Sequence, residues 1–237
     1  SFRDMAGMSL YGPWVAQAAG TPPLQPSVRL RLFCVPPVGM GAACYHGWAK
    51  ELSPGVELVP LELPAHGTRM GEELPYASSL PELAGSALDG LGAEVFRARP
   101  FVIFGHSFGA AVAFELCQEL KRRAWPLPEK LYVSASRPPQ FAAVEYDADR
   151  ATPALSELGE ADFWVAFERR YGANPDLQDQ YVREFVWKLL QADFTLLETY
   201  APSSLAPLPC PICALCAVGD ARCRPSQLSQ WARCTTE

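Results

Sequence analysis

The stretch PFVIFGHSFG, residues 100 to 109, constrains the fold of this chain more than any other part of the sequence. PFVIF is a short, continuous apolar run, which is typical of a strand buried on both faces. It leads into a Gly-x-Ser-x-Gly pattern and then into residues 109–123, which have helical periodicity. A serine in a tight turn between a strand and a helix presents its hydroxyl above the sheet. The pattern therefore predicts that Ser107 is a nucleophile; the alternative is a structural turn with a capping serine.

A serine nucleophile of this kind needs backbone donors for the negative oxygen that forms during attack. Gly105 and Gly109 leave room for neighbouring backbone in the turn. The backbone N–H of Phe108, at the start of the helix, is one expected donor. The glycine-containing loop VPPVGMGA follows an early strand, and the N–H of Val38 is the second candidate. The alternative for this loop is that its glycines only make a turn.

Strand-like and helical patterns alternate along the chain, which predicts an α/β fold with a mostly parallel sheet and helices on both faces. The expected strands are residues 28–35, 56–63, 100–104, 130–135 and 210–218. The expected helices between them are residues 43–52, 79–95 and 109–123, and Ser79 is the expected N-cap of the second.

Residues 139–200 interrupt the alternation with two helical patterns, 154–172 and 181–200. The second carries an apolar stripe at helical spacing, formed by Val182, Phe185, Val186, Leu189 and Leu190. A helical insertion between two sheet strands is where a lid over an active site would lie. The alternative is that these helices merely cover the sheet.

The composition suits one large domain. The chain has 237 residues, of which 49% are hydrophobic, enough for a sizeable core. We expect a loosely ordered lead-in at residues 1–28 and the domain at 29–237. The net charge of −6, without a long basic run, argues against nucleic acid as a partner. The sequence has no apolar run long enough for a membrane span and no signal peptide, which predicts a cytoplasmic protein.

Eight cysteines raise the question of a metal site, because the segment CPICALC places three of them close together. Against a metal, this segment reads as a strand, in which Cys213 and Cys216 would point to opposite faces. No histidine lies near them in the sequence. We therefore expect reduced, structural cysteines and no bound metal.

Several segments, in the same order along the chain, resemble the type II (external) thioesterases of fatty-acid, polyketide and non-ribosomal peptide synthesis, in the α/β-hydrolase superfamily. They are LFCVPPVGMGA, GWAKEL, LELPAHGTR, FGHSFGA, LLQADFTLLETY and CPICALCAVGD followed by LSQW. The serine turn alone would indicate only a hydrolase. LPAHGTR and QADFTLLETY are the segments that point to this branch, although LPAHG stands where LPGRG is usual.

The resemblance implies hydrolysis of acyl groups held as thioesters on a phosphopantetheine arm. The partner would be an acyl or peptidyl carrier protein, or acyl-CoA, and no cofactor is implied. Ser107 matches the nucleophile, and Val38 and Phe108 match the oxyanion donors. Asp220 matches the acid that orients the catalytic histidine; the alternative is an aspartate in a surface turn. The aromatic residues of the lid would shape an apolar acyl site.

The pattern breaks at the catalytic histidine. The sequence has three histidines, and none matches the family's base. His106 lies inside the serine turn with its ring directed away from the attack face, His66 could lie at the pocket rim, and His46 opens an early helix. The family's histidine follows a further strand in a Gly-Gly-His-Phe motif. We therefore expect that this chain is a fragment that lacks that strand and a helix. Without the catalytic histidine, the 237 residues alone should be nearly inactive.

Two other functions stay open at this point. The same fold could act as a general carboxylesterase or lipase, which substrate preference would distinguish. It could also be a carrier-binding relic that has lost its catalytic base, which the reading frame beyond Glu237 would reveal.

Overall fold

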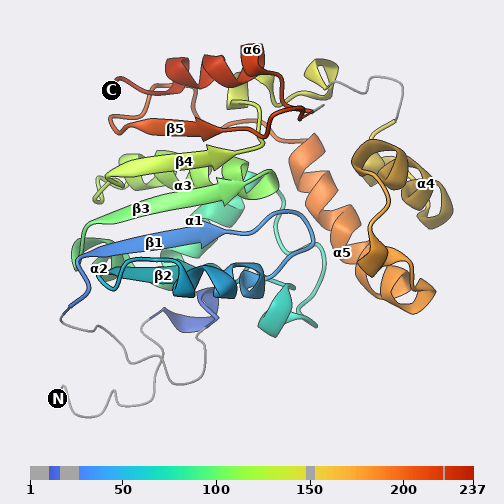
Figure 1. The fold of residues 1–237 in the computed structure, drawn as a ribbon, viewed down its shortest axis with the longest axis horizontal. Coiled ribbons are helices and arrows are strands. Elements are labelled where there is room, and N and C mark those ends of the chain that lie inside the picture. Colours follow the sequence, from blue (N-terminus) through green and yellow to red (C-terminus); the bar gives the residue numbers. More distant parts are fainter. Residues whose placement is uncertain (1–10, 17–26, 148–152, 221) are drawn as a thin grey trace.

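The protein is described from a computed structural model, which describes residues 11–16, 27–147, 153–220 and 222–237. Five strands form one sheet in the order β2-β1-β3-β4-β5, and every neighbouring pair is parallel. The strands are β1 (Leu30–Val35), β2 (Val56–Pro60), β3 (Phe101–His106), β4 (Lys130–Ser134) and β5 (Ile212–Leu215). Figure 1 shows them side by side with their carboxyl ends at one edge. The predicted parallel sheet is confirmed.

The main core lies on one face of the sheet, under α1 (Leu80–Leu91), α2 (Ala93–Arg97) and α3 (Phe108–Arg122). Alternating side chains of β1 serve the two faces, as the pleat requires. Phe33 and Val35 belong to the main core, whereas Leu32 and Cys34 join a smaller cluster with Tyr45 on the opposite face. Strand β1 is therefore apolar and buried on both of its faces.

Two predicted helices differ in detail. Residues 79–95 form two helices, because Gly92 has a φ of +77°, a conformation that glycine adopts easily, and ends α1 there. Ser79 accepts a hydrogen bond from the Glu82 N–H at 3.3 Å, so the predicted cap is confirmed. The segment expected to be a helix at 43–52 instead forms tight 3₁₀ turns over Ala42–Lys50.

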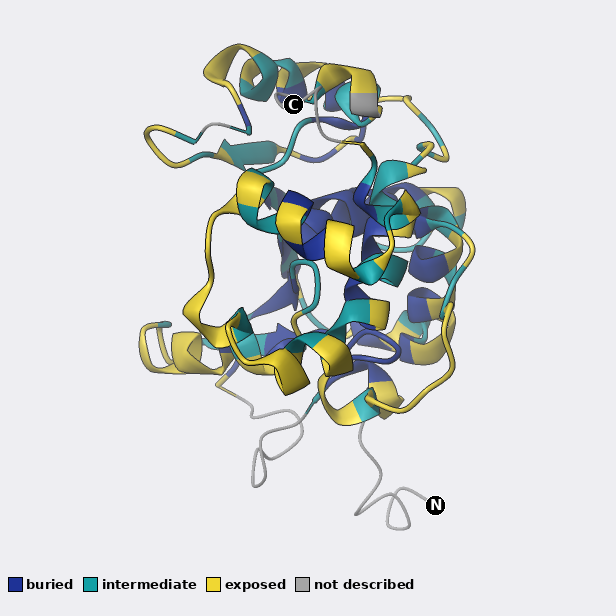
Figure 2. Cartoon of the chain, turned by 90° about the vertical axis from the view of Figure 1, so that its right-hand side faces the viewer, coloured by how far each residue is buried: buried dark blue, intermediate teal, exposed yellow. Residues whose placement is uncertain are grey.

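The insertion between β4 and β5 contains α4 (Glu160–Tyr171) and α5 (Gln180–Glu198). Both lie beyond the carboxyl ends of the strands, and α5 runs across that edge (Figure 1). Seen from this side, the two helices carry long exposed stretches in front of the buried sheet (Figure 2). We call α4 and α5 the lid helices.

The apolar stripe predicted for α5 is only partly buried. Leu189 and Leu190 are buried, but Phe185 is 65% exposed and Val182 is also exposed. The first turns of α5 project past the body of the domain, so their apolar side chains find no core to enter. Sequence periodicity marks the stripe but does not show where the neighbouring structure ends.

The two ends of the described chain pack onto the domain. Of the lead-in, residues 11–16 are not loosely attached, because Tyr11, Trp14 and Val15 are buried; residues 1–10 and 17–26 lie outside the described residues. Near the other end, the short helix α6 (Pro225–Leu228) precedes the 3₁₀ segment Ser229–Cys234. No helix in the described part has both the length and the apolar character that a bilayer crossing requires.

Candidate active site

Ser107 lies at the junction of β3 and α3 in a strained backbone conformation, with φ +53° and ψ −118°. A positive φ is unfavourable for a residue with a side chain, and such strain persists where the surroundings hold it. The Ser107 N–H donates to the Ser134 carbonyl at 2.8 Å, and the Ala110 N–H donates to the Ser107 carbonyl at 3.0 Å. The serine is thus fixed by β4 on one side and by the first turn of α3 on the other.

The two glycines of the turn stand where no side chain fits. A Cβ at Gly105 would lie 2.1 Å from the Gly109 carbonyl oxygen. A Cβ at Gly109 would lie 2.2 Å from the carbonyl oxygen of Val35, the last residue of β1. The backbone of β1 therefore passes directly against the start of α3, which places the loop after β1 beside the serine turn.

That loop is a tight turn of residues 37–40. The Met40 N–H donates to the Pro37 carbonyl at 3.1 Å, and Gly39 has a φ of +71°, as the third residue of a type II turn requires. Val38 is partly buried against the core. The Phe108 N–H is the first of α3, and the first amides of a helix have no acceptor within it. Both candidate oxyanion donors thus come from backbone held in tight turns.

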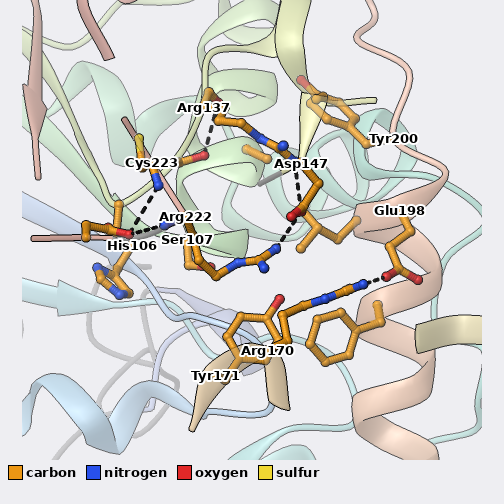
Figure 3. Close-up of a pocket in the computed structure, with 17 residues that line it drawn as sticks. His106, Ser107, Arg137, Asp147, Arg170, Tyr171, Glu198, Tyr200, Arg222 and Cys223 are labelled. Carbon is orange, nitrogen blue, oxygen red and sulfur yellow. Dashed lines mark hydrogen bonds and ion pairs between the residues drawn. The ribbon is translucent and has the colours of Figure 1, made fainter. Parts of the chain in front are cut away.

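Ser107 opens onto a cavity of about 270 Å³ between the sheet edge and the lid helices (Figure 3). His106 and Asp220 line the same cavity. Asp220 follows β5 in a turn, where its Oδ1 accepts the backbone N–H groups of Arg222 at 2.8 Å and Cys223 at 3.1 Å. The structure therefore brings the two residues matched to the nucleophile and the orienting acid to one cavity, 113 positions apart in the numbering.

His106 lines the cavity but is engaged elsewhere. Its Nδ1 lies 3.0 Å from the Ser134 hydroxyl, and among the described residues no hydrogen bond joins it to the Ser107 hydroxyl. Burial lowers the pKa of the His106 imidazole, and the nearby charge of Asp220 only partly offsets this. His46 is exposed on the Ala42–Lys50 segment.

The remainder of the cavity is more polar than the sequence suggested. Of the aromatic residues in the insertion at 139–200, Tyr171, Phe194 and Tyr200 line it. Phe163, Trp164 and Phe167 pack instead in a cluster within the lid itself. The reason is that α4 and α5 need a core of their own, because they lie beyond the main sheet.

Three arginines take the place of the expected apolar wall (Figure 3). Arg137 and Arg222 both pair with Asp147, and Arg170 pairs with Glu198 at 3.1 Å. The Arg222 guanidinium also lies over the Tyr171 ring, 4.9 Å from its centre. The cavity therefore combines aromatic surface with fixed charges of both signs.

His66 does not lie at the pocket rim, contrary to the expectation from the sequence. Its side chain is fully buried, with Nδ1 2.8 Å from the Pro64 carbonyl oxygen and Nε2 3.0 Å from Asp193 Oδ2. Asp193, on α5, is equally buried. Sequence reasoning missed Asp193 altogether; the one signal was a carboxylate on a helix that is otherwise apolar at that point.

The cysteines are all free thiols, and five of them are buried. Within the residues that the structure describes, no group of three or more His, Cys, Asp or Glu side chains is arranged to hold a metal ion. Cys216 and Cys223 lie close to Asp220, since the Cys216 thiol is 3.8 Å from its carboxylate and 3.2 Å from the Cys223 carbonyl.

A parallel sheet with a strained serine between a strand and a helix, facing a cavity at the carboxyl edge, defines an α/β-hydrolase. Comparison with known proteins agrees. The family model for the thioesterase domain matches residues 30–237. The thioesterase PikA5 of Streptomyces venezuelae is 32% identical over 212 residues, covering 89% of this chain and 72% of PikA5.

Solved structures show the same fold. RedJ, a thioesterase from the prodiginine pathway of Streptomyces coelicolor, aligns with a TM-score of 0.79 and 30% identity over 94% of this chain and 84% of RedJ. The type II thioesterase BorB from the borrelidin cluster aligns with a TM-score of 0.74 and 26% identity, over 94% and 85% of the two chains. The chain therefore belongs to the thioesterase domain family and is a hydrolase that acts on thioesters, and its resemblance to the type II thioesterases is confirmed.

Proposed function

We propose that this protein hydrolyses acyl thioesters on a phosphopantetheine arm, with Ser107 as the nucleophile, and that it edits or releases acyl groups during polyketide, peptide or fatty-acid assembly. The observation that carries the proposal is the strained Ser107 at the wall of the cavity that Asp220 also lines. Such a conformation is retained where the hydroxyl must stand clear of the backbone.

In this proposal Ser107 Oγ attacks the thioester carbonyl carbon, and the carbonyl oxygen becomes negatively charged. The N–H groups of Val38 and Phe108 stabilise this oxygen, and the Phe108 donor is helped by the positive end of the α3 dipole. The C–S bond then breaks, and the pantetheine thiol leaves after taking a proton. Water hydrolyses the acyl-serine ester and restores Ser107.

Proton transfer is the step that this chain does not complete by itself. No hydrogen bond among the described residues joins any of the three histidines to Ser107 or to Asp220. We therefore assign Asp220 as the residue that orients an imidazole base, and assign the base to none of His46, His66 and His106. On this assignment the 237-residue chain alone is a slow enzyme.

The substrate class follows from the relatives and from the cavity. BorB is a type II thioesterase from the borrelidin biosynthetic cluster, and RedJ is a thioesterase from the prodiginine biosynthetic pathway. A cavity of about 270 Å³ suits an acyl group of modest size rather than a long fatty chain. We therefore propose carrier-bound or CoA-bound short acyl groups as substrates.

The test is hydrolysis of acetyl-CoA, butyryl-CoA and the same acyl groups on a carrier protein by the protein made from its complete reading frame. Thiol release is measured, and a p-nitrophenyl ester serves as the oxygen-ester comparison. We expect turnover of the thioesters and its loss in Ser107→Ala. Ser136→Ala is the matched control, because Ser136 lines the same cavity outside the serine turn and its hydroxyl donates to the Arg137 carbonyl.

Residual turnover in Ser107→Ala equal to that of Ser136→Ala would remove Ser107 from the mechanism. A preference for the oxygen ester would favour a carboxylesterase. Stable binding of the acylated carrier without turnover, from the complete reading frame, would favour a carrier-binding role.

A further inference from the structure

One buried carboxylate connects the lid to the turn that carries the proposed oxyanion donor Val38. Asp193, on α5, has no exposed surface and accepts hydrogen bonds from three groups. They are the Gly39 backbone N–H at 2.7 Å, the His66 ring at 3.0 Å and the Tyr76 hydroxyl. These partners lie 154, 127 and 117 positions away in the sequence. We call these four residues the Asp193 network.

The hydrogen bonds of His66 indicate where its protons lie. His66 Nδ1 faces the Pro64 carbonyl oxygen, which can only accept, so Nδ1 carries a proton. Nε2 lies 3.0 Å from Asp193 Oδ2, so one proton lies between these two atoms. The hydrogen bond to Asp193 and the charge of that carboxylate outweigh burial and raise the pKa of the His66 imidazole, which favours its protonated form. A pair without solvent access is maintained by its full set of hydrogen bonds.

The contact with Gly39 acts on the turn itself. In the turn of residues 37–40, the peptide between Val38 and Gly39 is the central one, and its flip interconverts type I and type II turns. The carboxylate of Asp193 binds the N–H of this peptide and repels its carbonyl oxygen, so it stabilises the type II form. The α5 residue Leu190 packs on the same glycine, since a Cβ there would lie 2.5 Å from Leu190 Cδ2.

From this arrangement we propose that the Asp193 network is a positioning device for the oxyanion hole, which sets the turn of Val38 only while lid helix α5 is seated. Asp193, His66 and Tyr76 do not touch the substrate; they act through the Gly39 peptide. The inference rests on the proposed function, because it assumes that Val38 N–H stabilises the transition state. It assigns a role to the two segments, LPAHGTR and QADFTLLETY, that the serine mechanism leaves without one.

The first test compares Asp193→Asn with Glu57→Gln in thioester hydrolysis, using the protein from its complete reading frame. The two carboxylates are matched: Glu57 also accepts from a tyrosine, Tyr11, and from a buried cation, Arg31. Glu57 lies near the start of β2, at the amino ends of the parallel strands, whereas Ser107 lies at their carboxyl ends. We expect Asp193→Asn to lower kcat about tenfold to a hundredfold with KM within threefold, because a small misplacement of catalytic groups costs about this much. Glu57→Gln keeps its kcat within about threefold.

Two inhibitors separate positioning from general loosening of the fold. A trifluoromethyl ketone analogue of the acyl-pantetheine substrate forms a tetrahedral adduct with a negative oxygen, whereas the thioether analogue does not. We expect Asp193→Asn to weaken binding of the ketone by the same factor by which kcat falls. Binding of the thioether should stay within threefold of the wild type. If the affinity for both inhibitors falls equally, or if kcat is unchanged, the positioning role is wrong.

The second test does not depend on turnover. An amide proton bound to a carboxylate resonates at low field, so the Gly39 amide is followed by ¹H–¹⁵N NMR. We expect a clear upfield move in Asp193→Asn, and a smaller one in Tyr76→Phe, which removes only the donor to the other carboxylate oxygen. An unchanged Gly39 amide in Asp193→Asn would overturn the network.

Failure of the proposed function and failure of the positioning role give different experimental results. If Ser107→Ala retains turnover, the serine mechanism is wrong, and the NMR test still decides whether Asp193 holds the Gly39 peptide. If Ser107→Ala is inactive but Asp193→Asn keeps its kcat and its affinity for the ketone, the serine mechanism stands and the positioning role is wrong.

Discussion

At position 109 the absence of a side chain decides whether strand β1 and helix α3 can meet. A Cβ there would lie 2.2 Å from the Val35 carbonyl oxygen and 2.6 Å from that of Pro36, both of them backbone atoms that have little room to move. We expect Gly109→Ala to lower the free energy of unfolding by about 1–3 kcal/mol, as is usual for overpacking. It should also move Ser107 and reduce thioester hydrolysis.

Urea unfolding of Gly109→Ala and Gly47→Ala measures this effect. Gly47 is the control, because a Cβ at that position meets nothing within 4 Å. Its substitution should change the unfolding free energy by no more than about 0.5 kcal/mol. Equal losses in the two variants would show that the close approach at Gly109 is not what limits the turn.

His66 makes a pH-dependent contribution to stability. Burial lowers the pKa of its imidazole, but the hydrogen bond to Asp193 and the charge of that carboxylate outweigh it, so the net pKa is raised above 6.5. Proton binding is therefore tighter in the folded state. The stabilisation is fully present below the unfolded pKa and is lost as pH rises through the folded pKa.

The measurement is urea unfolding of the wild type and of His66→Gln at several pH values from 6 to 9. The wild type should be more stable than the variant at pH 6, and the difference should shrink as pH rises. Each unit by which the folded pKa exceeds the unfolded one corresponds to about 1.4 kcal/mol. A difference that grows with pH would mean that His66 is neutral in the folded protein.

Among the elements, the lid helices are held by a small core of their own. Phe163 is fully buried, and its ring contacts those of Trp164, Phe167, Trp187 and Phe194. We expect Phe163→Ala to cost about 3–5 kcal/mol. Phe185→Ala, on the exposed part of α5, should cost no more than about 0.5 kcal/mol. Hydrogen exchange of the α4 and α5 amides measures both, and similar protection in the two variants would contradict this packing.

The elements also show how far sequence reasoning reaches in this chain. Strand β3, the serine turn and helix α3 were predictable because short-range patterns determine them: an apolar run, two glycines and a helical repeat. The break at Gly92 depends on a single positive φ, and the turns over Ala42–Lys50 keep an apolar spacing that imitates a helix. Neither could be separated from a regular helix by periodicity alone.

The candidate site, too, could be predicted only where short-range sequence patterns determine it. Ser107 and Asp220 could be matched because each follows a recognisable strand. The pairing of His66 with Asp193 spans 127 positions and exists only once α5 lies across the sheet edge, so no local pattern indicates it. The charged wall of the cavity escaped prediction for the same reason, because Arg137, Arg170 and Arg222 come from three separate segments.

Across the whole molecule, the proposed catalytic groups gather at one edge of the sheet. The turn of residues 37–40 follows β1, Ser107 follows β3, and Asp220 follows β5. Because these strands are parallel, all three segments lie on the same side of the sheet. In α/β sheets this carboxyl edge is where ligands bind. Among the described residues, no imidazole contacts both Ser107 and Asp220.

That arrangement predicts chemical rescue. The 237-residue chain should hydrolyse butyryl-CoA about 10⁴-fold more slowly than a complete triad would allow. Free imidazole can enter the cavity and accept the Ser107 proton, so thiol release should rise with imidazole concentration. The same titration on Ser107→Ala gives the background due to imidazole in solution, which is subtracted. On the proposed assignment His106 is not the base, and its Nδ1 contacts the Ser134 hydroxyl, so His106→Gln should respond like the wild type. If His106→Gln instead abolishes turnover that imidazole then restores, His106 is the base, and the assignment of proton transfer to an imidazole outside these three histidines is wrong.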